Sequence, residues 1–596
     1  MHSFPCLAPA AVALVALLTA CGDSQPLTNA GSGPETPVVT APVARYSGVA
    51  PDASLPGPFA ASEPREYDLG QYLVSDGDNG LAYNVDVHGQ VRAPTSGSGP
   101  FPVVLYLHGR HVTCSYGGFE FLSAGICPEI NGLVLEIKPV PSYVGYDYMA
   151  AHLASAGYVV LSIDANDIND KDLTGDQGVQ ARAQLLLHHL DVFRQINLAG
   201  GEGFDDLKGR MDFSRIGLMG HSRGGQGVAH AVRFNQARVN VLPALPGDPE
   251  GFTAPHQIKA VFALAPTDFD RHTTPGVAFA TLLPYCDGDV SNLQGAWMFD
   301  DNRALEGDDS GPRFQILARG TNHNFYNTIW VDDDYGSDDP YCGSESATTG
   351  RDVPEDQRRH GEFLMSAFFR AFVGNESTFA RYWQGVVRAP DAACPNGSGP
   401  CDARLLLSAQ PGSQNRWLID AFTSAESLTA NTLGLATTLQ GFVAPSICTS
   451  AQDGSGCGSA RTYSVASQLQ LAWDAPNASY QTLLGGLDVR GYDTLNLRAG
   501  LVVGDARNAG GQQLVAVLSD TAGHSAEVDA SRFTDALFDP PGNPEASNGA
   551  KTTLNGVAIP LTAFTGVDLQ RLQSLTLRFP HAGGALQLTD LMLQKR

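Results

Sequence analysis

The chain is poor in cationic side chains. Its 596 residues contain 37 Lys and Arg against 62 Asp and Glu, which gives a formal net charge of −25 at pH 7. Binding to nucleic acid or to an anionic membrane requires a cationic surface, because phosphate groups must be neutralised. The excess of acidic over basic residues therefore excludes nucleic acid as an expected partner. We expect the negative charge to keep the protein soluble.

Long hydrophobic runs are also scarce. The clearest hydrophobic segment extends from Leu7 to Leu18. Its length of about 12 residues is typical of a signal peptide and is too short for a helix that crosses a bilayer. It ends in Leu18-Thr19-Ala20-Cys21, which resembles the bacterial lipobox. This resemblance implies a signal peptide over residues 1–20, a lipid anchor on Cys21 and a place in the bacterial cell envelope. The n-region lacks Lys and Arg, so a plain secretory signal is the alternative.

The cysteines lack the spacing of a metal site. There is no CxxC and no Cys/His cluster at zinc spacing, so we do not expect these thiols to bind a metal. The serine chemistry considered below needs no metal or organic cofactor either, and we expect none. Beyond Cys6 and Cys21, eight cysteines remain, and an even number in an exported chain indicates disulfides. Spacing alone does not fix the connectivity. Short loops favour pairing of neighbours: Cys114 with Cys127, Cys286 with Cys342, Cys394 with Cys401 and Cys448 with Cys457.

The chain is too long for a single core, and its patterning changes along its length. Residues 21–60 are rich in Pro, Gly, Ser and Thr and predict a flexible tether. Over residues 61–385, nearly continuous apolar strands alternate with helical patterns, which predicts an open α/β sheet with helices on both faces. A linker is expected at residues 386–401. The period-2 pattern of residues 402–596 predicts an all-β sandwich.

The elements of the α/β region can be placed individually. Strands are expected at 102–107, 158–163, 215–219, 260–265, 278–283 and 313–318, and helices at 177–196 and 355–372.

One strand leads directly into a serine between glycines. In "RIGLMGHSRGGQGVAH" (215–230), Ser222 is flanked by Gly220 and Gly224 and followed by a helical pattern. A turn this sharp strains the serine backbone and leaves no room for side chains two residues away. It presents the hydroxyl at the carboxyl edge of the sheet, near a helix N-terminus that favours negative charge. Ser222 is therefore a candidate nucleophile, with an ordinary strand-turn-helix joint as the alternative.

Two later loops provide an acid and a base in the order that a serine triad on this fold requires. "PYCDGDVSN" follows the strand "AFATLL", and "RGTNHNFYN" follows the strand "RFQILA". Here the chain resembles the α/β-hydrolase family, especially secreted esterases and cutinase-like polyester hydrolases, with loops of the form G-D-x-D and G-x-x-H. The resemblance implies His323 as the base and Asp289 as the acid. Cys286 stands where that family has glycine, which keeps Asp287 as the alternative acid.

An oxyanion hole is expected next to Ser222. "VVLYLHGRHVT" places His108-Gly109 at the end of a strand. In the resembled family this turn directs the following amide at the oxyanion, which implies the backbone N–H groups of Arg110 and Arg223 as donors. A plain strand-ending turn is the alternative. His221 is assigned to packing or hydrogen bonding.

These residues together predict a serine esterase. Ser222, His323 and Asp289 would hydrolyse a carboxylic ester through an acyl-enzyme. A polyester or an acylated polysaccharide is the expected polymeric substrate. A serine peptidase or amidase on the same triad, and a catalytically silent surface binding protein, are the alternatives.

Three further features have two interpretations each. The aromatic residues of the insertion at 113–148 line a pocket or, as we favour, form the core of a small cap. The acidic run 332–339 binds calcium or, as we favour, is a solvated loop. The C-terminal region resembles galactose-binding-like jelly rolls of the carbohydrate-binding-module type. Its aromatic residues form a stacking platform or, as we favour, fill the core: Trp417, Trp473, Tyr480 and Tyr492.

Overall fold

The computed structural model describes residues 46–596, apart from 77–79, 118, 122–126, 128–136, 238–254, 304, 306–308, 337, 344–349, 450–456 and 458–460. The described residues belong to one compact unit, Val39–Arg596. The expected signal peptide, Cys21 and the tether up to residue 45 lie outside the described residues. Within the described part, every helix is too short or too polar to span a bilayer.

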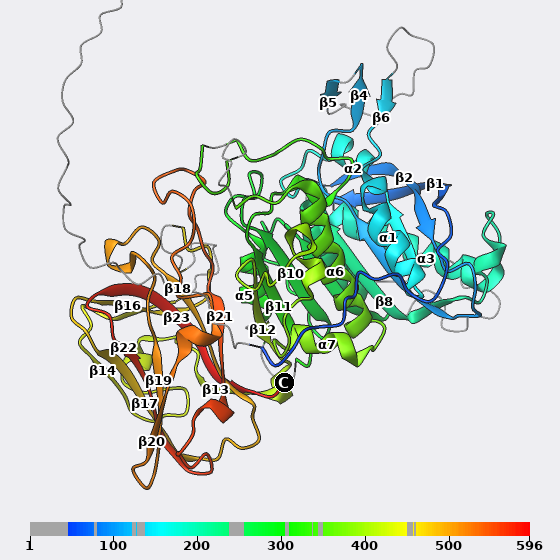
Figure 1. Ribbon diagram of the computed structural model, residues 1–596. Helices are drawn as coiled ribbons and strands as arrows, with labels where there is room; N and C mark the ends of the chain where they lie inside the picture. The colour runs from blue at the N-terminus through cyan, green and yellow to red at the C-terminus, as the bar shows by residue number, and fades with distance from the viewer. Residues whose placement is uncertain are drawn as a thin grey trace, which may run out of the picture. The chain divides into compact units, whose positions relative to one another are not determined.

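Strands between residues 65 and 410 form one nine-stranded sheet, part of which can be followed in Figure 1. Its strand order is β1-β2-β7-β3-β8-β9-β10-β11-β12, and the pairs from β7 to β11 are parallel. The remaining three pairs at the two ends are antiparallel. The strands are β1 (Arg65–Asp76), β2 (Leu81–Arg92), β3 (Phe101–Leu107), β7 (Val159–Ile163), β8 (Met211–His221), β9 (Ile258–Leu264), β10 (Ala278–Pro284), β11 (Arg313–Ala318) and β12 (Leu405–Gln410).

Helices cover both faces of this sheet. On one face, α1 (Asp147–Ser155) and α6 (Pro354–Phe372) share a core with Val104 and Tyr106 of β3. On the other face, α3 (Val179–Ala199) and α4 (Arg223–Ala237) pack with the alternate residues of the same strand. Burial on both sides explains why the central strands are continuously apolar. The other helices are α2 (Asn166–Lys171), α5 (Gly295–Arg303) and α7 (Ser377–Trp383).

The expected boundaries differ from the observed ones in three places. Residues 46–60, expected in the tether, contact the α/β region: the Ala50 N–H donates to the Arg388 carbonyl and Ala53 is buried. The expected linker is packed as well, since Ala393 and Cys394 lie in the core. The strand β12 belongs to the α/β sheet, although it falls within 402–596. Its period-2 pattern is that of an antiparallel edge strand, which sequence alone does not distinguish from a sandwich strand.

Beyond β12, the described strands form two antiparallel sheets. One has the order β15-β16-β23-β18-β21, with β13 also paired to β23, and the other has the order β14-β17-β22-β19-β20. Trp473 and Tyr480 lie in the core shared by these strands and Tyr492 packs against it, which confirms the packing interpretation for these residues. For Trp417 that interpretation is wrong, because its side chain is 42 % exposed. The strands are β13 (Arg416–Asp420), β14 (Thr437–Gln440), β15 (Ser446–Cys448), β16 (Gln468–Trp473), β17 (Ala478–Leu487), β18 (Thr494–Leu501), β19 (Val515–Asp520), β20 (Ser525–Asp529), β21 (Asn555–Pro560), β22 (Leu572–Phe579) and β23 (Gly584–Gln594).

All four predicted disulfides are present, which confirms the pairing of neighbours. The first of them, Cys114–Cys127, lies in the expected insertion, which carries a small sheet of β4 (Cys114–Tyr116), β5 (Phe119–Phe121) and β6 (Ile137–Pro139). Tyr146 of this segment is buried in the main core.

Candidate active site

Ser222 occupies a strained turn between β8 and α4. The strand ends at His221, the helix begins at Arg223, and Ser222 between them has a φ of 57°. A non-glycine residue with positive φ is held there by its surroundings. Here the Ser222 N–H donates to the Leu264 carbonyl at 2.9 Å, and the Ser222 carbonyl accepts from the Gly225 N–H at 2.9 Å. The turn is therefore fixed by β9 on one side and by the first turn of α4 on the other.

Glycines make this turn possible because backbone groups approach them closely. A Cβ on Gly220 would lie 2.1 Å from the Gly224 carbonyl oxygen, and one on Gly224 would lie 2.3 Å from the Leu107 carbonyl oxygen. A Cβ on Gly109 would lie 2.5 Å from the Cβ of Ser222. The loop after β3 thus packs directly on the serine, as an oxyanion loop must.

His323 pairs with Asp287 at the carboxyl ends of β10 and β11. The Nδ1 atom of His323 lies 2.9 Å from Oδ2 of Asp287, and both side chains are buried, Asp287 to 1 % exposure. The other oxygen of Asp287 accepts the N–H groups of Asp289 at 3.0 Å and Val290 at 2.6 Å. The carboxylate is therefore held in place from both ends.

Asp289, the acid favoured by the sequence, occupies a different position. Its carboxylate is 61 % exposed and lies 3.5 Å from Nε2 of His323, on the opposite edge of the ring from Asp287. A triad acid orients the imidazole by accepting the Nδ1–H hydrogen bond. The geometry therefore favours Asp287, the alternative that the sequence left open, as the partner of Nδ1.

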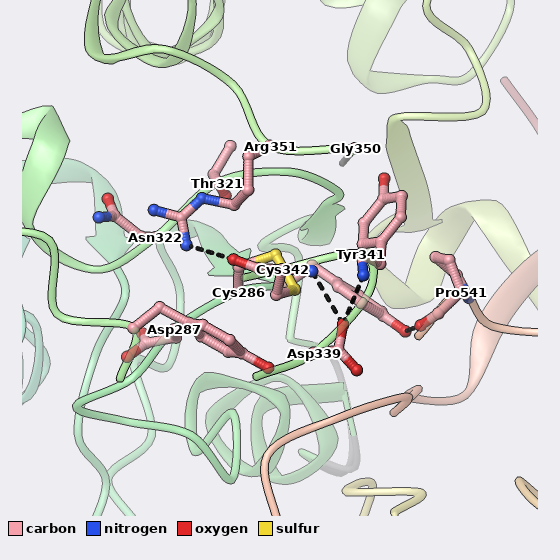
Figure 2. The surroundings of a disulfide bond; sticks show 12 residues. Cys286, Asp287, Thr321, Asn322, Asp339, Tyr341, Cys342, Gly350, Arg351 and Pro541 are labelled. Atoms are coloured by element: carbon pink, nitrogen blue, oxygen red, sulfur yellow. Dashed lines mark hydrogen bonds between the residues drawn. A yellow bond between two sulfur atoms is a disulfide. The ribbon is translucent and has the colours of Figure 1, made fainter. Parts of the chain in front are cut away.

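The acidic run 332–339 organises the two loops that carry Asp287 and His323. One oxygen of Asp334 lies 2.7 Å from the Gly288 N–H nitrogen and 3.3 Å from the His323 N–H nitrogen, and the other accepts from Asn324. Figure 2 shows the neighbouring disulfide Cys286–Cys342, where Asp339 accepts the N–H groups of Tyr341 and Cys342. These carboxylates stabilise loops, a role that the sequence did not indicate. Among the described residues, no cluster of three or more His, Cys, Asp or Glu is arranged to hold a metal ion.

The electrostatic environment favours the protonated form of His323. Burial lowers the pKa of the ring, but the carboxylates of Asp287, Asp289 and Asp334 outweigh burial and raise it to about 9. His221 packs against His323 with ring centroids 4.9 Å apart and contacts the Tyr146 hydroxyl through Nδ1 at 2.9 Å. Burial, followed by the charge of His323, lowers the pKa of His221 well below its usual value. Hydrogen bonding and packing are therefore its observed roles.

A hollow of about 240 Å³ opens beside Ser222. Both expected oxyanion residues, Arg110 and Arg223, line it together with Asp289. Arg223 is the first residue of α4, where a backbone N–H has no carbonyl partner within the helix. Nε2 of His323 is buried and has no hydrogen-bond partner among the described residues. Ser222, both arginines and Asp289 thus line one hollow, and Nε2 of His323 is left free to accept or donate a proton.

The C-terminal region reaches the loop that bears Asp287. The Asn548 side-chain amide donates to the Asp287 carbonyl at 2.9 Å, and the Tyr285 hydroxyl donates to the Pro541 carbonyl at 2.6 Å (Figure 2 shows the second bond). The buried ammonium of Lys551 donates to the Ser291 carbonyl at 3.1 Å and to Oδ1 of Asn548 at 2.6 Å. No motif in the sequence pointed to these residues, because the contacts join segments about 260 positions apart.

Part of the chain is similar to known ester hydrolases. A family model described as PET hydrolase-like matches residues 131–275, which include Ser222 but neither Asp287 nor His323. The chain is 29 % identical over 154 residues to a bis(hydroxyethyl) terephthalate hydrolase of Streptomyces coelicolor, a match covering 25 % of this chain and 38 % of that protein. It is 30 % identical over 156 residues to cutinase 2 of Thermobifida cellulosilytica, covering 26 % and 52 %. It is 28 % identical over 156 residues to cutinase est1 of Thermobifida alba, covering 26 % and 46 %. The chain therefore spans about half or less of the length of these relatives, and the similarity centres on a PET hydrolase-like segment.

Proposed function

We propose that the protein is a serine esterase that cleaves carboxylic esters with Ser222 as nucleophile, His323 as base and Asp287 as acid. The observation that carries this proposal is the buried 2.9 Å contact between His323 and Asp287, in which His323 packs on His221, the neighbour of a serine held at positive φ. The similarity to cutinases and to a terephthalate ester hydrolase supports ester rather than amide substrates. Asp289 is not part of this triad.

Strand order supports the fold assignments on which the proposal depends. The order β1-β2-β7-β3-β8-β9-β10-β11 places the nucleophile after the central strand β8, and the acid and the base follow later strands on the same edge, as in an α/β-hydrolase. In the C-terminal region, the strands β16 to β23 are divided equally between two sheets, in the orders 16-23-18-21 and 17-22-19-20. We assign this arrangement to the eight-stranded jelly roll.

The chemistry follows from the positions of these groups. His323 takes the proton of Ser222 through Nε2 as Oγ attacks the ester carbonyl, and Asp287 holds the imidazole in the required tautomer and stabilises its cation. The backbone N–H groups of Arg110 and Arg223 donate to the oxyanion. His323 then protonates the leaving alcohol. In the second half of the reaction His323 takes a proton from water, which attacks the acyl-enzyme and releases the acid from Ser222.

Substrate class and location are further parts of the proposal. The relatives named as cutinases and as a terephthalate ester hydrolase favour polyesters, with acylated polysaccharide as a second polymeric class. The jelly roll would hold the polymer surface. Export, with a lipid on Cys21, places the enzyme at the cell envelope or outside the cell.

Hydrolysis of 4-nitrophenyl acetate, butyrate and octanoate by the chain that begins after Cys21 tests the proposal. Turnover that disappears in Ser222→Ala, together with labelling of Ser222 by a fluorophosphonate, is the expected result. Equal and near-background rates in both proteins would contradict an esterase and favour amide substrates or binding alone.

A further inference from the structure

Two arginine side chains, in a protein of net charge −25, lie beside the proposed nucleophile. The hollow next to Ser222 is lined by Arg110, Arg223 and one carboxylate, Asp289, with Thr267, Phe269, Val290 and Gln294 completing the lining. Two cations and one anion leave the hollow with an excess of positive charge. This contrasts with the rest of the molecule and calls for a function.

The guanidinium of Arg223 lacks the partners that a buried cation normally has. Its Nη1 atom is buried and has no hydrogen-bond partner among the described residues. A buried charged donor without a partner is costly, and such an atom in a native structure indicates a missing acceptor. Burial of the group, followed by the nearby charge of Arg110, lowers the pKa of Arg223, which shows that its surroundings stabilise the cation less than water does.

Arg110 is held in place by a neutral group. Its Nη1 donates to Oε1 of Gln177 at 2.7 Å, a contact that orients the side chain and leaves its charge uncompensated. Asp176 and Asp289 act on Arg223 only from beyond ion-pair distance, and Asp289 is mostly exposed on the histidine side of the hollow. The positive charge is therefore available to a ligand.

An apolar surface lies next to the charged group. The Arg223 guanidinium stands 5.1 Å from the ring centroid of Phe269, and Phe269 is 52 % exposed. An exposed phenyl ring beside a guanidinium can pack against an apolar spacer while the guanidinium binds the group at its end. Arginine binds carboxylates through two parallel hydrogen bonds, so a carboxylate suits this site.

On the basis of the proposed esterase function, we infer that the preferred substrates are esters that carry a free carboxylate, namely monoesters of dicarboxylic acids, with Arg223 and Arg110 as the residues that recognise the carboxylate. Such monoesters arise when a diester or a polyester of a dicarboxylic acid is cleaved once. The class of reaction that supplies this substrate is therefore a preceding ester hydrolysis.

A matched pair of substrates tests this inference. The 4-nitrophenyl monoester of suberic acid carries a terminal carboxylate, and the corresponding suberamate has a neutral amide of the same shape. We expect kcat/KM to be about tenfold higher or more for the carboxylate substrate at low salt, because a charge-assisted hydrogen bond stabilises binding by an amount that corresponds to at least a tenfold ratio. The preference should shrink as salt rises.

Variants of the residues that line the hollow test which of them cause the preference for the carboxylate substrate. Arg223→Gln should reduce the ratio of the two kcat/KM values to near 1, Arg223→Lys should retain part of it, and Arg110→Gln should reduce it independently. Asp289→Asn, which removes the carboxylate that lines the hollow, should increase the ratio. Thermal unfolding and fluorophosphonate labelling confirm that each variant is folded, and the two arginine positions give separate tests if one variant does not fold.

The outcomes separate this inference from the function on which it rests. Equal hydrolysis of both esters by the unmodified enzyme, or a ratio that survives both arginine substitutions, overturns carboxylate recognition while leaving the esterase intact. Failure to hydrolyse either ester, with no difference from Ser222→Ala, contradicts the esterase itself.

Discussion

The serine turn and the acid loop lie on the same edge of the sheet but are supported in different ways. The turn at Ser222 is built within the α/β region, from β8, β9, α4 and the loop after β3. The loop at Asp287 is held by a disulfide, by the acidic run and by Asn548 and Lys551 of the C-terminal region. The proposed nucleophile is therefore positioned by local backbone geometry, whereas the proposed acid is positioned by distant segments.

This difference also explains where sequence similarity is found. The family model covers Ser222 and ends before Asp287. A turn fixed by glycines keeps a recognisable motif, because few residues fit it. A loop held by hydrogen bonds from another region has no such constraint on its own residues.

The largest expected effect is at the serine itself. Ser222→Ala removes the nucleophile, and we expect ester hydrolysis to fall by about 10⁴-fold or more. Steady-state rates with 4-nitrophenyl butyrate measure this loss. Ser96→Ala, at an exposed serine, is the matched control and should keep full activity. Similar rates in the two variants would show that another residue is the nucleophile.

The two aspartates of the acid loop should differ strongly. Asp287→Asn leaves Nδ1 of His323 without an acceptor for its proton, and kcat should fall by about 10³-fold or more. Asp289→Asn removes an exposed charge on the other edge of the ring and should keep kcat for neutral esters within about tenfold. Each variant is the control for the other. The reverse order of effects would restore Asp289 as the acid.

Closing the gap at the oxyanion loop should damage the serine turn. A methyl group on Gly109 would lie 2.5 Å from the Cβ of Ser222, so Gly109→Ala must displace either the serine or the loop. We expect kcat to fall by about 10²-fold, as expected for a misplaced oxyanion donor. Gly175→Ala, where an added Cβ meets nothing within 4 Å, is the control. Unchanged kcat in Gly109→Ala would mean that the loop is not held against the serine.

The acid loop should depend on the C-terminal region more weakly. Lys551→Met removes both bonds of the ammonium group and one positive charge near Asp287. We expect kcat per labelled active site to fall by roughly tenfold, while KM changes little. Lys595→Met, at an exposed lysine of the same region, is the control. If fewer Ser222 sites were labelled but kcat per labelled site were unchanged, Lys551 would contribute to folding and not to catalysis.

The smallest effect concerns pH. Because catalysis needs neutral His323, whose pKa is raised to about 9, kcat/KM for a neutral ester should rise with pH through that value. Asp289→Asn removes one carboxylate that raises this pKa, so the acid limb should move to lower pH by roughly half a unit. Lys551→Met removes a cation near Asp287, which should raise the pKa of His323 and move the acid limb to higher pH. The titratable groups around His323 are Asp287, Asp289, Asp334, His111, His221 and Lys551. A limb near pH 6.5 in every variant would contradict this account.

The sequence predicted the parts of the molecule that short-range patterns determine. The apolar runs located the parallel strands, and β11 was placed at its observed bounds, 313–318. The glycines around Ser222 predicted its turn because each excludes a side chain for a local reason. The four disulfides followed from short spacing.

The parts that sequence did not predict depend on long-range contacts. Asp287 and Asp289 are two positions apart, and only the fold determines which of them faces Nδ1. Asp334 lay in a run that suggested solvent exposure, but it bonds to both loops. No sequence motif pointed to Lys551, because the loop that it contacts is far away in the chain. The edge strand β12 was assigned to the wrong layer because its periodicity fits either sheet.

The disulfide Cys286–Cys342 makes the acid loop sensitive to the compartment in which the chain folds. It joins the residue before Asp287 to the segment that follows the acidic run. Such bonds form and persist in oxidising surroundings and are rare in the cytosol. A newly made chain in a reducing compartment can form the serine turn, but its acid loop lacks this covalent link. The full activity proposed for this site would then require oxidising surroundings, in which the covalent link can form.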